Sequence, residues 1–193
     1  MKQKMPRGRG KLMGISLTGL IPLFLLCACG GRELTNVTLI QTLAVDGAGP
    51  VTVTAAGEGE TYCLSAADAA VAQEKLKGLG TQRLETTHIQ QIVLGPEVDV
   101  EDCLRREVIH RESGYGATVW RSGGGQAGEL LAAASDLPAR LTSLEENAGV
   151  EAPTVLEALS DLTCRGRTQL PVLEAEGDEV RVIGYETVEV SGR

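Results

Sequence analysis

The chain has 193 residues, with 18 Lys and Arg against 26 Asp and Glu, and only five aromatic side chains of Phe, Trp and Tyr. Five basic residues precede position 12 and no acidic residue occurs before position 29, so residues 29–193 carry 13 basic and 26 acidic side chains. A net charge of −13 repels phosphate backbones, and we expect no nucleic-acid partner. The scarcity of aromatic side chains predicts a core of Val, Leu, Ile and Ala.

The first 29 residues combine a basic start, an apolar run and a cysteine. The run extends from Leu12 to Cys29 and ends in Leu26-Cys27-Ala28-Cys29. A basic region, an apolar region and small residues before a cut site are typical of a secretory signal. The aliphatic residue at −3 and the small residue at −1 make this site a lipobox. We therefore expect residues 1–28 to be a lipoprotein signal peptide and the Cys29 thiol to be thioether-linked to diacylglycerol.

Two other interpretations of this segment are weaker. A permanent membrane span needs roughly 20 apolar residues, and this run is shorter and is interrupted by Gly14, Gly19 and Pro22. A plain secretory signal gives no reason for a cysteine directly after the cut site. We therefore expect residues 29–193 to fold outside the cytoplasm, tethered to a membrane by acyl chains.

The first half of the mature chain predicts strands and helices in alternation. Gly47-Ala48-Gly49-Pro50 separates two β-branched runs and indicates a hairpin. Ser65-Ala66-Ala67-Asp68 resembles a capping box and predicts the start of an alanine-rich helix that ends at Gly78. Asp99 is the expected cap of the next helix. The predicted elements are strands over 37–46, 51–56 and 89–94 and helices over 65–77 and 100–110.

The second half continues this alternation and ends in a hairpin. Pro138 suits the first turn of a helix, and a turn at Gly177-Asp178 separates two strands of alternating character. The predicted elements are strands over 116–121, 168–174 and 180–190 and helices over 126–134, 138–148 and 153–162. This order predicts an α/β (α+β) fold, a mixed sheet with flanking helices and hairpins at both ends.

Three glycines satisfy the dinucleotide-binding pattern G-x-G-x-x-G between a predicted strand and a predicted helix. They are Gly123, Gly125 and Gly128. The motif lies in the middle of the chain, whereas the fingerprint belongs to the first βα unit, and the acids at the expected distance fall in a helix. We therefore interpret it as a flexible strand-to-helix turn and expect no cofactor.

The histidines and cysteines carry no metal or redox signature. His88 precedes a strand and His110 lies near a helix end. A metal site formed by both histidines with Glu107 or Glu112 would lack the HExxH spacing. Cys63, Cys103 and Cys164 are widely spaced, with no CxxC. One disulfide among these three is an open alternative to three buried thiols. No serine lies in G-x-S-x-G, so we expect no metal, no catalytic residue and no enzymatic activity.

The order of short segments resembles the Ger(x)C spore-germination lipoproteins. The clearest similarity is His88-Ile89-Gln90-Gln91-Ile92-Val93-Leu94-Gly95, a histidine, a strand and a glycine. The other matching segments are Cys29, Arg32-Glu33-Leu34, Ala44-Val45-Asp46, Gly59-Glu60-Thr61, Arg111-Glu112, Ala117 to Trp120, Gly125 to Leu131, Leu170-Pro171-Val172-Leu173 and Val182-Ile183-Gly184. The resemblance covers residues 29–193 but only the N-terminal region of that family. Gly30-Gly31 replaces the family's Trp-Asp pair, and we expect the family's C-terminal domain to be absent.

The resemblance implies a non-catalytic lipoprotein subunit of a germinant receptor. Such subunits act beside integral-membrane subunits on the outer face of the spore's inner membrane. The resemblance transfers a role to one residue only, the lipidated Cys29. A solute-binding or envelope-assembly lipoprotein unrelated to germination remains an alternative, as does an extracytoplasmic enzyme.

Overall fold

The computed structural model describes residues 37–47, 51–57, 60–67, 71, 75, 78, 83–110, 115–134, 136–177 and 179–190. They belong to one compact unit, 36–193. The strands are β1 (Val37–Leu39), β2 (Thr42–Asp46), β3 (Val51–Gly57), β4 (Glu60–Ala66), β5 (Arg83–Glu85), β6 (Gln91–Leu94), β7 (Thr118–Ser122), β8 (Arg167–Glu176) and β9 (Glu179–Glu189). The helices are α3 (Val100–His110), α4 (Ala127–Ala133), α5 (Leu137–Ala148) and α6 (Val155–Arg165).

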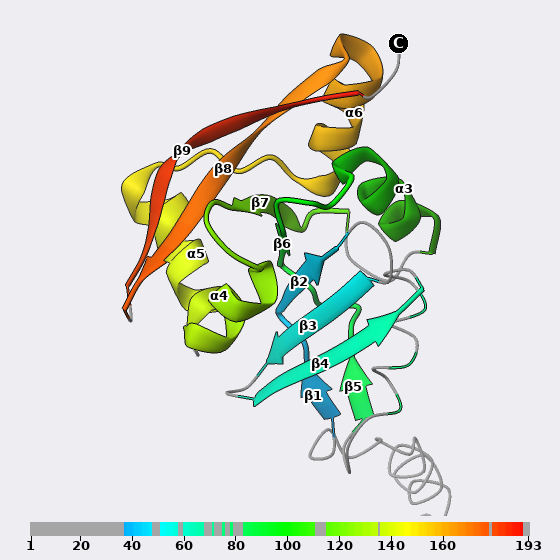
Figure 1. Ribbon diagram of the computed structural model, residues 1–193, viewed down its shortest axis with the longest axis vertical. Helices are drawn as coiled ribbons and strands as arrows, with labels where there is room; N and C mark the ends of the chain where they lie inside the picture. The colour runs from blue at the N-terminus through cyan, green and yellow to red at the C-terminus, as the bar shows by residue number, and fades with distance from the viewer. Residues whose placement is uncertain are drawn as a thin grey trace, which may run out of the picture. The chain divides into compact units, whose positions relative to one another are not determined.

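A mixed sheet of seven strands lies at the centre of the unit, in the order β4-β3-β2-β6-β7-β8-β9 (Figure 1). The four strands β2, β6, β7 and β8 are parallel. The β2–β3 and β3–β4 pairs on one edge and the β8–β9 pair on the other are antiparallel. The predicted fold class, a mixed sheet with flanking helices and hairpins at both ends, is confirmed.

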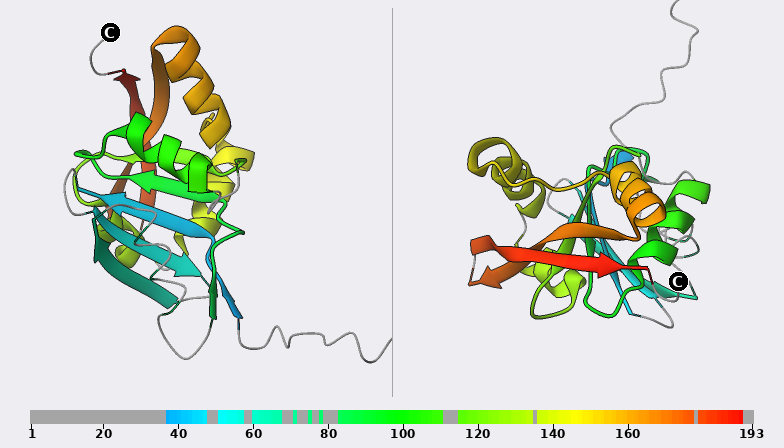
Figure 2. Two further views of the ribbon diagram at one scale, coloured as in Figure 1. Left: turned by 90° about the vertical axis from the view of Figure 1, so that its right-hand side faces the viewer. Right: turned by 90° about the horizontal axis from the view of Figure 1, so that it is seen from above.

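The central strands direct side chains into two cores because successive residues of a strand point to opposite faces. Ile92 and Leu94 join an apolar cluster with residues of α3 and α6, whereas Val93 joins a second cluster with residues of α4 and α5. All three side chains are fully buried. Figure 2 shows α3 and α6 on one side of the sheet and α4 and α5 on the other. The β6 strand therefore supports both layers.

The first predicted strand is divided in the structure. β1 pairs in parallel with β5 in a separate two-stranded sheet, and β2 pairs with β3 and β6 in the large sheet. Between them, the Ile40 amide donates to the Glu85 carbonyl and the Gln41 amide to the Ala56 carbonyl, both at 3.0 Å. The segment predicted as one strand is thus divided between two sheets, which its pattern did not indicate.

The predicted capping box at Ser65 is wrong. Ser65 and Ala66 are the last residues of β4, which pairs with β3 in the register Val53↔Leu64 and Val51↔Ala66. Tertiary pairing overrides the local similarity to a cap, and β4 as a whole was not predicted. Most of the expected helix to Lys77 lies outside the described residues.

Three predicted helix starts are confirmed, although the capping box at the third was not predicted. The Asp99 carboxylate accepts a hydrogen bond from the Asp102 amide at 3.0 Å, and Pro138 lies in the first turn of α5. The start of α6 is a reciprocal capping box between Thr154 and Glu157. The helix ends at Gly166, whose φ of 73° favours glycine. Helix α6 is therefore defined at both ends by local chemistry.

Candidate functional site

The predicted lipidation site, Cys29, and the signal peptide before it lie outside the described residues. Within the part of the chain that the structure describes, no helix has both the length and the apolar character needed to cross a bilayer. Because Cys29 is outside the described residues, its lipidation stays a prediction from the lipobox.

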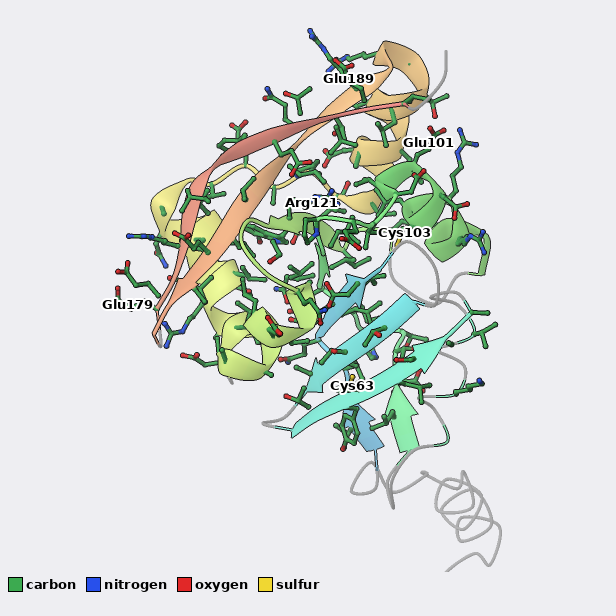
Figure 3. All side chains as sticks on the ribbon, in the orientation of Figure 1. Cys63, Glu101, Cys103, Arg121, Glu179 and Glu189 are labelled. Carbon is green, nitrogen blue, oxygen red and sulfur yellow. The ribbon has the colours of Figure 1, made fainter. Side chains whose placement is uncertain are left out.

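The candidate metal and disulfide residues are dispersed. His88 lies in the exposed turn before β6, and His110 is the last residue of α3. Among the described residues, no group of three His, Cys, Asp or Glu side chains is arranged to hold a metal ion. Cys103 is buried on α3, whereas Cys63 on β4 and Cys164 on α6 are exposed, and none of the three forms a disulfide (Figure 3). The expectation of three buried thiols is therefore wrong for two of them.

The N-terminus of α4, where the glycine motif would place a phosphate, is occupied by the chain's own carboxylate. Asp46 ends β2 and is only 6% exposed. Its Oδ1 accepts a hydrogen bond from the Ala127 amide at 2.7 Å, and its Oδ2 accepts one from the Gly128 amide at 2.8 Å. A negative charge is stabilised at this end of a helix. Asp46 therefore satisfies the orphan amides that would otherwise bind an external anion.

The motif glycines serve close packing around this contact. A Cβ on Gly128 would lie 2.6 Å from Thr54 Oγ1, and one on Gly123 would lie 2.7 Å from a Val172 methyl carbon. The intervening Gly124 has open space around it. The segment is a strand-to-helix turn, as predicted, and neighbouring strands explain the glycines at positions 123 and 128.

A buried cation ties the C-terminal hairpin to the centre of the sheet. Arg121 on β7 is 6% exposed and lies between α3 and the β8–β9 ribbon (Figure 3). Its guanidinium donates to the Pro96 carbonyl at 2.7 Å, to the Val98 carbonyl at 3.2 Å and to Glu186 Oε2 at 3.2 Å. Since a buried charge is costly unless it is paired, these contacts indicate a structural role for Arg121.

A groove of about 1270 Å³ is the candidate binding site. It forms because β8 leaves β7 early: the two strands pair only at Arg121↔Val172 and Ser122↔Leu173. Beyond that point the α5–α6 connection lies beside β7, where the Val119 amide donates to the Pro153 carbonyl at 2.9 Å. Residues of the connection, of α6 and of the β8–β9 ribbon line this groove. We call it the ribbon groove.

Acidic side chains predominate in the ribbon groove. It is lined by four carboxylates and two guanidiniums, which belong to Glu145, Glu151, Glu157, Asp161, Arg165 and Arg167. The remaining lining side chains are mainly polar and include Gln169, Thr168, Thr187 and Tyr185. The Tyr185 hydroxyl accepts a hydrogen bond from the Glu151 amide at 3.3 Å and joins the ribbon to the connection. The groove therefore suits a polar or cationic ligand better than an apolar one.

Two of these carboxylates already form hydrogen bonds or an ion pair with residues of α6 and its N-cap. The Thr154 backbone amide donates to Glu157 at 2.8 Å, and this bond, with that of the Thr154 hydroxyl, holds the pKa of Glu157 below its ordinary value. Asp161 forms an ion pair with Arg165 at 3.1 Å. Glu145 differs, because its buried Oε1 has no hydrogen-bond partner within the protein.

The groove was not predicted from the sequence, because its lining comes from segments far apart in the chain. The only local signal was the turn-rich stretch before Pro153, which separates two helices. Comparisons with protein-family models, with curated proteins and with solved structures each find no match for this chain.

Proposed function

We propose that this protein is a membrane-anchored extracytoplasmic lipoprotein that acts as a non-catalytic subunit of a spore germinant receptor. The observation that carries the proposal is the lipobox before Cys29, followed directly by an acidic chain. The compact unit begins at Asn36, a few residues after the proposed anchor. Such a chain can hold a folded domain close to the membrane surface, where integral-membrane partners are within reach.

The finer assignment to germination depends on the resemblance to the Ger(x)C lipoproteins. The segment with the clearest similarity, residues 88–95, contains β6, which packs in both cores. Another matching segment ends at Asp46, the carboxylate that caps α4. These segments thus coincide with buried positions of this fold.

The ribbon groove favours a second candidate function, that of a solute-binding or envelope-assembly lipoprotein unrelated to germination. Its volume of about 1270 Å³ is ample for a solute. Neighbouring genes separate the candidates: genes for receptor membrane subunits would support germination, and genes for transporter permeases would support solute binding.

The anchor is tested by replacing Cys29 with alanine. Without the thiol no thioether can form, so we expect a precursor that is neither lipid-labelled nor cleaved before residue 29. Incorporation of labelled fatty acid and migration of the protein measure the two effects, and Cys27→Ala serves as the control that keeps the anchor. Continued labelling of the Cys29→Ala protein would contradict this assignment.

The germination role is tested by deleting the gene in its spore-forming host. We expect nutrient-triggered germination to be lost or strongly slowed, measured as the fall in optical density of a spore suspension. The wild-type gene should restore germination, and the Cys29→Ala gene should not. Unchanged germination in a host without a redundant receptor operon would overturn the role in germination.

A further inference from the structure

We propose that this protein forms a homodimer in which strand β9 pairs with β9 of a second copy, antiparallel, about a two-fold axis at Thr187. The inference goes beyond the proposed function, because it depends on the C-terminal ribbon and not on the anchor or on germination. Within the described part of the chain, β9 is the last strand of the seven-stranded sheet, with β8 on one side and no strand on the other. The outer edge of β9 is therefore the surface to consider.

Three positions of β9 direct their backbone groups towards this outer edge. The Val190 amide donates to the Gly166 carbonyl at 3.0 Å, so these two residues form a hydrogen-bonded pair. Bonded and non-bonded pairs alternate along an antiparallel ladder, and every second residue before Val190 therefore turns its N–H and C=O groups away from β8. We call these residues the outer positions. They are Tyr185, Thr187 and Glu189.

A proline on β8 supports this assignment independently. Pro171 lies opposite Tyr185 and has no N–H to donate, which suits a non-bonded pair. The register of the ribbon shifts only further along, between Val172 and Leu173, so the outer positions belong to one regular stretch. An edge strand with exposed N–H and C=O groups is a template for another strand. Strand β9 contains neither proline nor lysine, the residues that commonly prevent such pairing.

A second copy of the chain supplies the complementary backbone groups. The outer positions are spaced two residues apart, so a two-fold axis at Thr187 maps the set onto itself. Thr187 then lies opposite the partner's Thr187, and Tyr185 lies opposite the partner's Glu189. The two residues of a bonded antiparallel pair exchange both of their hydrogen bonds. No other two-fold antiparallel register joins all the outer positions of both copies, and such self-complementarity is what a two-fold interface requires.

The side chains are compatible with this register. Opposed threonines stabilise an antiparallel pair, whereas opposed like charges destabilise it. Glu189 lies opposite an aromatic ring of the second copy, and Glu186 lies opposite the partner's Val188, so no two carboxylates face each other directly. Glu186 also accepts a hydrogen bond from the buried Arg121 at 3.2 Å, which compensates its charge within its own copy.

Engineered cysteines test the register directly. The full chain is purified in detergent with Cys63→Ser and Cys164→Ser, which remove the two exposed thiols. Thr187→Cys should then form a covalent dimer under mild oxidation, because the Cα atoms of a bonded pair lie about 5.5 Å apart, within reach of a disulfide. A mixture of the Tyr185→Cys and Glu189→Cys proteins should cross-link as well. Each of these two alone should give at least about fivefold less dimer on a non-reducing gel, because its two cysteines would lie about 13 Å apart.

Two further variants separate pairing from folding. Thr187→Lys places two ammonium groups beside the axis, so it should lower cross-linking of the Tyr185→Cys and Glu189→Cys mixture at least about fivefold. Ser160→Lys is the matched control, because it adds the same charge at an exposed position of α6. It should leave the amount of dimer unchanged. Both variants replace exposed residues and should keep the native emission of the buried Trp120.

Several results would overturn the proposal. The absence of a Thr187→Cys dimer would do so, as would equal cross-linking by Tyr185→Cys alone and by the mixture, which would indicate another register or random collision. Cross-linking of Thr187→Cys to a different membrane protein of the host, in place of the homodimer, would assign the edge to that partner. Two copies with a net charge of −13 each repel one another, and salt screens this repulsion. Cross-linking should therefore rise between about 0.05 and 0.5 M NaCl, and a fall would show that ion pairs, not backbone groups, hold the copies together.

Discussion

Replacing Ile92 with aspartate should abolish folding of the unit. Ile92 lies on β6, is fully buried and packs in the core that α3 and α6 cover. The substitution removes a large apolar side chain and buries a carboxylate without a partner. The combined loss of several kcal/mol approaches the roughly 5–15 kcal/mol by which a domain is stable. We therefore expect no cooperative unfolding transition.

The fluorescence of Trp120 measures this effect directly. It is the only tryptophan of the chain and is fully buried in the opposite core. Its emission should shift to that of an exposed indole in Ile92→Asp. Ile183→Asp is the matched control, because Ile183 lies on the edge strand β9 and is 50% exposed. This control should keep a native emission spectrum, and a native spectrum for Ile92→Asp would show that β6 is not essential to the core.

The central layers of the fold could be predicted because their signals are local. Strand β6 is a short apolar run bounded by turn residues. Helix α3 follows an aspartate cap, and α5 carries proline in its first turn. These features depend on neighbouring residues alone, and the structure places each element within a few residues of its predicted range.

The missed features are one adjacent hairpin strand and two arrangements that depend on partners distant in the chain. Strand β4 forms a hairpin with the preceding strand β3, but Ser65 near its end is a residue type that is favoured at helix N-caps, and this local signal predicted a helix instead. Asp46 reads as the end of a strand, yet its hydrogen-bond partners are 81 and 82 residues away. The ribbon groove likewise arises where β8 separates from β7. No pattern within a short window contains the Asp46 contact or the groove.

Asp46→Ala should lower the free energy of unfolding by about 2–4 kcal/mol, because it removes both acceptors from the amides of Ala127 and Gly128. Those amides would remain buried without partners, and the site would lose the charge that favours a helix N-terminus. Asp46→Asn should fall between alanine and the native residue. Its amide oxygen still accepts one bond, whereas its NH₂ group faces the other N–H. Urea denaturation followed by Trp120 fluorescence measures all three proteins.

Asp136→Ala is the matched control for this helix-cap prediction. Asp136 occupies the N-cap position of α5 but makes no side-chain cap bond, and its exposed carboxylate accepts a hydrogen bond from the half-buried Arg140 at 2.7 Å. Such a surface pair contributes little to stability, so this variant should unfold close to the native midpoint. If Asp46→Ala were as stable as Asp136→Ala, the α4 terminus would tolerate uncapped amides.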